Sequence, residues 1–159
     1  MPSKLITTWS EHDSAVQEIL DLSSAALLVF DESLSPLKLE RRARIAALQR
    51  LLSARQAATR LTFVVQKPDF VRQYSPQLME LLTIYSPTLT ILQAPPHLDS
   101  LKDSLLIADS RHALVRFHRD HPRARLIIDD SEEVAPYQQR FEEILGEGGD
   151  PLSPTTLGL

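Results

Sequence analysis

The sequence predicts an α/β domain in which a mixed β-sheet is flanked by helices, in the order β-α-β-α-β-β-β-β-α. Two observations carry this prediction. Up to Pro95-Pro96, short apolar runs alternate with amphipathic helical patterns, and such alternation favours parallel strands joined by right-handed crossovers. Beyond these prolines, three strand-like runs follow one another with no room for helices between them, which implies hairpins and antiparallel pairing.

The first elements are a helix, a buried strand and a long second helix. Ser10 marks a helix start, and apolar residues recur at helical spacing over residues 10–22. Residues 25–30 (AALLVF) are almost wholly apolar, as expected of a strand buried on both faces. Ser35-Pro36 predicts the start of a helix that continues to about residue 55. Its arginines are expected mainly on the solvated face: Arg41, Arg42, Arg44 and Arg50.

The remaining elements complete the predicted sheet and cover it. A helix at 76–85 separates predicted strands at 61–65 and 88–92. The closely spaced strands are expected at 104–108, 113–117 and 125–128. A last helix covers residues 131–145, and its predicted inward face consists of Val134, Tyr137, Phe141 and Ile144.

Composition sets the broad class of the protein. The chain has 159 residues, of which 43% are apolar and 24% charged, which are ordinary globular proportions. We expect one domain over residues 1–145 and a flexible tail at 146–159, which contains most of the glycine. Residues 1–9 lack the apolar core of a signal peptide, and no run is long enough to span a membrane. We therefore expect a cytoplasmic protein with no membrane contact.

Several chemistries are excluded or disfavoured by residue type. The absence of cysteine removes disulfides and thiolate chemistry, and all four glycines lie in the tail, so the folded body has no glycine-rich phosphate loop. The histidines and acids nearest to a metal-binding cluster do not have the spacing of a known zinc motif: Asp109, His112, His118, Asp120 and His121. We expect neither a metal nor a cofactor. The net charge of −4 gives no general attraction to nucleic acid.

The segment 111–125 (RHALVRFHRDHPRAR) is the one notable basic cluster, with five arginines and three histidines against one acid. Arginine suits phosphate and carboxylate groups, and Phe117 would add a stacking surface, so an anion site is one interpretation. The interpretation we favour is a hairpin exterior paired with acids just downstream: Asp129, Asp130, Glu132 and Glu133.

The element order, together with LLIAD and LIIDD in the segment 103–145, resembles one half of the phospholipase D superfamily. That family carries H-x-K-x4-D on one strand and G-S-x-N shortly after it. With Asp109 at the aspartate position, Lys102 stands in place of the histidine and Ser104 in place of the lysine. The glycine, serine and asparagine are replaced by Arg116, Phe117 and Arg119. Only the aspartate of the motif is present, and the chain also resembles a bacterial family of such degenerate halves.

The resemblance implies a fold without the family's activity. The active enzymes use a histidine nucleophile, a second histidine as acid, and lysine and asparagine to stabilise the phosphate, so we expect no phosphodiesterase activity here. Because active members join two halves, we expect a homodimer. An anion-binding cleft is expected at Lys102, Ser104, Asp109, Arg116, Phe117 and Arg119, for a phosphate-bearing ligand or a protein partner.

Two other functions remain open. One is a hydrolase with a rebuilt site around Asp109, Arg116, His118 and His121, in which a histidine is the general base. The other, which we regard as less favoured, is nucleic-acid binding by the basic cluster 111–125.

Overall fold

The computed structural model describes residues 3–54 and 56–153. Its strands are β1 (Lys4–Ile6), β2 (Ala26–Asp31), β3 (Arg60–Val65), β4 (Leu89–Gln93), β5 (Ser104–Ala108), β6 (His112–Arg116), β7 (Ala124–Ile127) and β8 (Asp150–Pro151). The helices are α1 (Trp9–Leu22), α2 (Arg42–Ser53), α3 (Asp69–Tyr74), α4 (Pro76–Tyr85) and α5 (Ser131–Gly146), with 3₁₀ turns η1 (Ser35–Leu37) and η2 (Pro96–Leu98).

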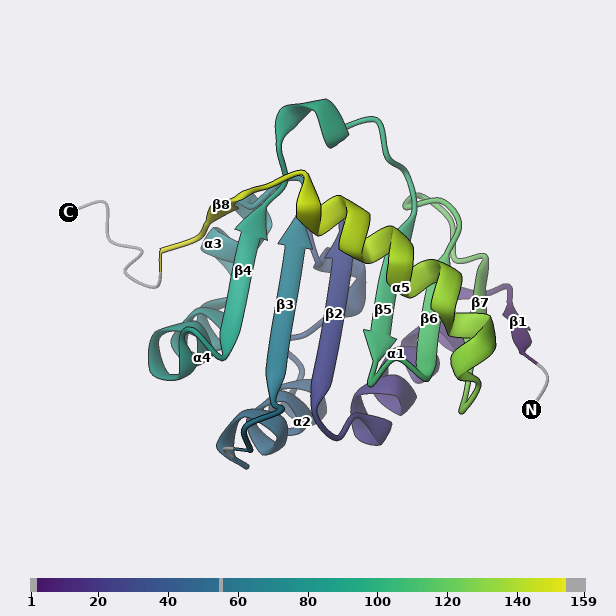
Figure 1. Ribbon diagram of the computed structural model, residues 1–159, viewed down its shortest axis with the longest axis horizontal. Coiled ribbons are helices and arrows are strands. Elements are labelled where there is room, and N and C mark those ends of the chain that lie inside the picture. The colour runs from purple at the N-terminus through teal and green to yellow at the C-terminus, as the bar shows by residue number, and fades with distance from the viewer. Residues whose placement is uncertain (1–2, 55, 154–159) are drawn as a thin grey trace.

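Within these residues the strands form one eight-stranded sheet in the order β1-β7-β6-β5-β2-β3-β4-β8 (Figure 1). β2, β3 and β4 are parallel, because α2 and the α3–α4 pair return the chain to the same end of the sheet. β5, β6, β7 and β1 pair antiparallel, and so does β8 at the other edge. The prediction of a mixed sheet flanked by helices is confirmed.

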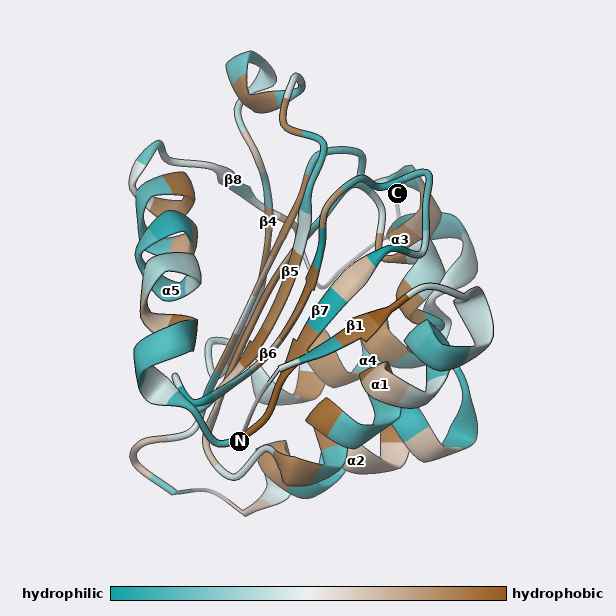
Figure 2. Cartoon of the chain, turned by 90° about the vertical axis from the view of Figure 1, so that its right-hand side faces the viewer, coloured by the Kyte–Doolittle hydropathy of each residue, from teal (hydrophilic) through white to brown (hydrophobic). Residues whose placement is uncertain are grey.

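Helices cover both faces of the sheet, in unequal number (Figure 2). α1, α2, α3 and α4 lie on one face, and the larger apolar core fills the space between them and the sheet. α5 lies alone on the other face, where Val134, Phe141 and Ile144 pack on the second core. This is the inward face that the helical spacing predicts. None of the described helices is long and apolar enough to cross a membrane.

The predicted helix at 35–55 is wrong in its first third. The chain makes the short turn η1, leaves it through Lys38 and begins α2 only at Arg42. Leu34 and Lys38, on either side of η1, have left-handed backbone angles, with φ of 72° and 50°, which interrupt a helix. Arg44 is also not solvated. It is 3% exposed, and its guanidinium donates to the carbonyl of Leu37 at 2.9 Å.

Both ends of the described chain add short edge strands that the sequence pattern does not predict. β1 pairs with β7. β8 lies in the segment expected to be a flexible tail, and pairs with β4 through Leu92 and Pro151. Leu152, next to it, is 4% exposed, and its N–H donates to the carbonyl of Ile91 at 2.8 Å. The rest of that expected tail, residues 154–159, lies outside the described residues.

Asp109 closes the end of the sheet where β2 begins. Its carboxylate accepts hydrogen bonds from the N–H groups of Ser24, Ala25 and Ala26 at 2.8–2.9 Å, and from the Ser24 hydroxyl at 3.1 Å. Burial alone would raise the pKa of Asp109, but the backbone hydrogen bonds outweigh it, so the pKa is lowered. Asp109 is therefore an ionised structural anchor between β5 and the start of β2.

We predict that Asp109→Asn lowers the free energy of unfolding by about 1–3 kcal/mol at pH 7, because charged hydrogen bonds to backbone donors are lost. The lowered pKa means that this contribution is present above the pKa of the unfolded carboxyl and disappears as the pH falls through the folded value. Urea denaturation at several pH values measures it. Asp99→Asn, at an exposed position, is the matched control and is expected to have no such effect. Equal stability of both variants at pH 7 would contradict the anchoring role.

Candidate functional site

Three polar side chains lie side by side on neighbouring strands at the carboxyl end of β2. Ser104 of β5 pairs directly with Arg116 of β6, and the pairing of Phe30 with Leu105 places Asp31 beside Ser104. Asp31, Ser104 and Arg116 are 0%, 4% and 1% exposed. We call these three residues the buried polar row. Since polar and charged groups removed from water lose their hydration, each of these three side chains needs a neighbour that replaces it.

Asp31 is the acceptor at the centre of this row. Its Oδ1 accepts from Arg116 Nη2 at 2.9 Å and from the Ser104 hydroxyl at 2.6 Å. Its Oδ2 accepts from the backbone N–H groups of Ser33 at 3.1 Å and Leu34 at 2.7 Å. The carboxylate thus has four donors, which together replace its hydration.

Helix α1 adds two rings on the other side of Arg116. Arg116 Nη1 lies 3.2 Å from His12 Nε2, and since a guanidinium only donates, Nε2 is the acceptor and the imidazole is neutral. Burial, followed by the charge of Arg116, lowers the pKa of His12 to about 4. The Trp9 ring lies over the Arg116 guanidinium at 5.5 Å and meets the His12 ring edge-on at 5.3 Å. The two rings cover the ion pair from the helix side.

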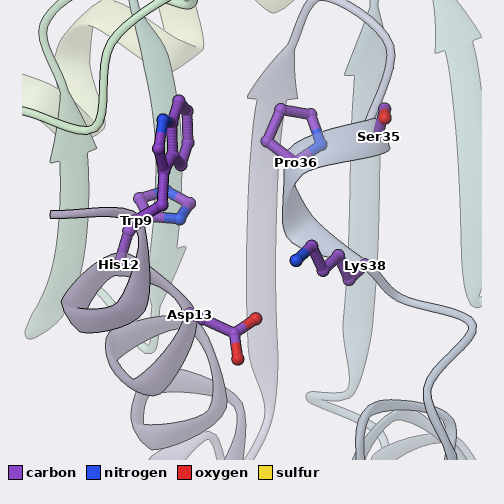
Figure 3. Close-up of a pocket in the computed structure, with 6 residues that line it drawn as sticks. All are labelled: Trp9, His12, Asp13, Ser35, Pro36 and Lys38. Carbon is purple, nitrogen blue, oxygen red and sulfur yellow. The ribbon is translucent and has the colours of Figure 1, made fainter.

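A cavity of about 260 Å³ opens between the start of α1 and the turn η1 (Figure 3). Its lining residues are Trp9, His12, Asp13, Ser35, Pro36 and Lys38. We call this cavity the Trp9 pocket. Figure 3 shows the Trp9 and His12 rings on one side, with the Pro36 ring across from them and Lys38 below it. The pocket is therefore bounded by rings and carries charged side chains at its base.

Arg119 connects loops at the same end of the sheet. Its guanidinium donates to Gln66 Oε1 at 3.1 Å and lies 3.3 Å from the Glu32 carboxylate. Its backbone N–H donates to the carbonyl of Lys102 at 2.7 Å. Gln66 in turn donates from Nε2 to the carbonyl of Leu98 at 2.8 Å. Arg119 is thus part of a polar network that fixes the loops after β2, β3, β4 and β6.

The structure brings only part of the predicted anion site together. Ser104 and Arg116 are in contact with the same carboxylate, and Arg119 and the exposed Lys102 lie in loops at the same end. Phe117 is 40% exposed. Asp109 lies at the opposite end of β5 from Ser104, where it holds the start of β2. The aspartate is therefore not part of this cluster.

The basic cluster 111–125 is largely neutralised by acids. Arg111 pairs with Asp129, and Arg125 with Glu133 at 3.5 Å, which confirms the predicted pairing with downstream acids for these two arginines. For Arg116 and Arg119 that pairing is wrong, because their acids are Asp31 and Glu32, far earlier in the sequence.

His118 and His121 lie together in the exposed loop between β6 and β7, with ring centroids 5.2 Å apart. Asp109 is at the other end of the sheet, so the structure does not assemble the rebuilt site proposed around these histidines. Within residues 3–54 and 56–153, no three His, Asp or Glu side chains are grouped so that they could hold a metal ion.

His12, Asp31, Trp9 and Gln66 are the site residues that sequence reasoning misses. Asp31 carries a weak signal, because it directly ends the apolar run 25–30. His12 carries none, since a histidine at a helical spacing among apolar residues is ordinary in a protein core.

No known family profile matches the sequence, and no curated protein matches it either. Solved structures, in contrast, do match this chain. NucT from Helicobacter pylori superposes with a TM-score of 0.63 at 11% identity, covering 95% of this chain and 99% of NucT. Nuc from Salmonella typhimurium, a phospholipase D family member, gives 0.61 at 10% identity, covering 95% and 97%. The chain therefore has a phospholipase D-like fold.

A third structure is an archaeal chromatin protein, TrmBL2, described as showing a novel mode of DNA binding. It superposes with a TM-score of 0.69 at 15% identity, over 96% of this chain. The chain spans 55% of the length of TrmBL2. At these identities the three likenesses concern the fold.

The lowered pKa of His12 predicts a pH dependence of stability. Between pH 6.5 and about 4 the unfolded chain binds a proton at His12 that the folded chain does not bind. Stability should therefore fall by roughly 2–3 kcal/mol as the pH is lowered through this range, with no further change from His12 below it. His12→Gln, which can still accept from Arg116, should lose this component. His121→Asn, at an exposed position, should retain it. Urea midpoints at pH 7 and 4.5 measure the difference, and parallel curves for all three proteins would contradict the assignment.

Proposed function

We propose that this chain is a non-catalytic phospholipase D-like module that binds a ligand or a protein without turning it over. The observation that supports this most directly is the buried polar row. Where the family has a lysine, Ser104 donates its hydroxyl to Asp31, and the neighbouring Arg116 is already paired with the same carboxylate. Both groups have an internal partner and are nearly inaccessible to solvent.

The imidazole nearest to this row is also unsuited to attack on phosphorus. A nucleophilic histidine needs a free lone pair aimed at the substrate. The Nε2 lone pair of His12 faces Arg116 at 3.2 Å, and the ring is 2% exposed. Lys102, at the position of the family's nucleophile, is exposed and carries an amino group in place of an imidazole. These arrangements favour binding over chemistry.

The alternative of a rebuilt hydrolase has little support from the geometry. It requires Asp109, Arg116, His118 and His121 to share one site. Asp109 is engaged with the backbone at the start of β2, Arg116 is buried with Asp31, and the two histidines lie in a surface loop.

Nucleic-acid binding is a second candidate because of the likeness to TrmBL2, whose description concerns DNA binding. Against it stands the pairing of Arg111, Arg116, Arg119 and Arg125 with acidic side chains, which leaves less positive charge for phosphates. Phosphate contacts would make affinity fall steeply with salt. A salt-dependent mobility shift of a DNA duplex, reduced in Arg111→Gln and Arg125→Gln variants, would favour this candidate over a small-ligand or protein module.

We predict that the protein does not hydrolyse bis-p-nitrophenyl phosphate above the blank rate, with or without divalent metal ions. Nitrophenolate release measures this directly. Lys102→Ala and Asp31→Asn variants, checked for folding by circular dichroism, show whether any residual release belongs to the protein. Turnover that is lost in either variant would refute the non-catalytic proposal.

We also expect two copies to associate, because active phospholipase D enzymes bring two halves together. Light scattering coupled to size exclusion should then give twice the 17.9 kDa of the chain. A single-chain mass at micromolar concentration would contradict the dimer and leave the binding proposal standing.

A further inference from the structure

We infer that the Trp9 pocket binds a small aromatic anion, a planar ring that carries one phosphate or carboxylate group. The inference rests on the proposed binding function and names its site and ligand class. The volume of the Trp9 pocket is about 260 Å³, just below the roughly 300–1,000 Å³ of pockets that bind drug-sized molecules. A single-ring ligand is therefore the appropriate size.

The walls of the pocket favour a planar apolar group. Trp9 is 44% exposed although it lies at a cavity, and Pro36 presents its ring from the opposite side (Figure 3). One side of the indole is held by Arg116 and the edge contact with His12. The tryptophan is thus fixed in place before a ligand arrives, which reduces the entropy lost on binding. Aromatic rings gain from contact with such a surface beyond the area they bury.

The charges at the pocket favour an anion. Lys38 is exposed, and within the described part of the chain its ammonium has no carboxylate partner. The one acid in the lining, Asp13, is paired with Arg41 at 2.6 Å and with Arg44 at 3.1 Å. Its negative charge is therefore balanced by two cations, and the free charge at the pocket is the positive one of Lys38.

The backbone holds Lys38 at this place. The turn η1 is anchored by the buried side chains of Leu34 and Leu37, and Leu34 N–H donates to Asp31 in the buried polar row. The Lys38 carbonyl accepts from the N–H of Arg41 at 3.2 Å. The position of the lysine thus follows from the core of the protein and not from a free loop.

Phenyl phosphate is the probe for the test, and Trp9 is its reporter because it is the only tryptophan of the chain. We expect a saturable change in tryptophan fluorescence and a dissociation constant that rises with salt. Inorganic phosphate and cyclohexyl phosphate, which lack an aromatic ring, should bind more weakly by a factor of about three or more. Benzylammonium, with the opposite charge, should not compete.

The variants test whether binding depends on the residues of this pocket. Lys38→Gln should weaken phenyl phosphate binding about fivefold, and Lys4→Gln, at an exposed lysine of the edge strand β1, should leave it unchanged. Trp9→Leu should weaken phenyl phosphate binding as well, and calorimetry measures it because this variant lacks the fluorescent reporter. Absence of binding by the folded wild-type protein, an unaffected Lys38→Gln variant, or a loss in Lys4→Gln alone would overturn the inference. Release of phenol would instead contradict the non-catalytic function while the binding inference stands.

Discussion

The ion pair between Asp31 and Arg116 is the constraint on which the candidate site of this protein depends. Both side chains are buried, and an ion removed from water loses several kcal/mol of solvation unless partners replace it. The partners come from three separate segments, namely β5 through Ser104, α1 through His12, and the loop after β2 through its backbone N–H groups. Because the two buried charges need these partners, the ion pair constrains how the segments pack against one another.

The same pair connects the core with the surface pocket. The second oxygen of Asp31 binds the N–H groups of Ser33 and Leu34, and Leu34 leads directly into η1 with a left-handed backbone. On the other side, Arg116 supports the Trp9 ring. The two walls of the pocket are thus positioned by the acid and the base of one ion pair. The residues that support the two walls, Asp31, Arg116 and Leu34, are themselves buried.

The sequence predicts the fold well and the site only in part, for a physical reason. Long apolar runs such as 25–30 and 104–108 report burial directly, so the sheet and its mixed pairing follow from local pattern. The local pattern does not predict β8, because its segment GGDP has the composition of a coil. This strand forms only because it pairs with β4. The contacts of Asp31 with Ser104 and Arg116 span 73 and 85 residues. Motif spacing marks Ser104 and Arg116 as unusual, but it contains no information about which acid they reach.

The motif residue Asp109 and the replaced motif positions Ser104 and Arg116 have different structural roles. Asp109 is the one residue that matches the family's motif, and it is engaged with three backbone N–H groups at the start of β2, at the opposite end of β5 from Ser104. An aspartate in this role is needed by the fold whether or not the protein has an activity. At the other end of β5, the side chains of Ser104 and Arg116 form internal hydrogen bonds with Asp31. The end of the sheet that holds the Asp109 anchor and the end that holds the buried polar row are therefore stabilised by separate sets of contacts.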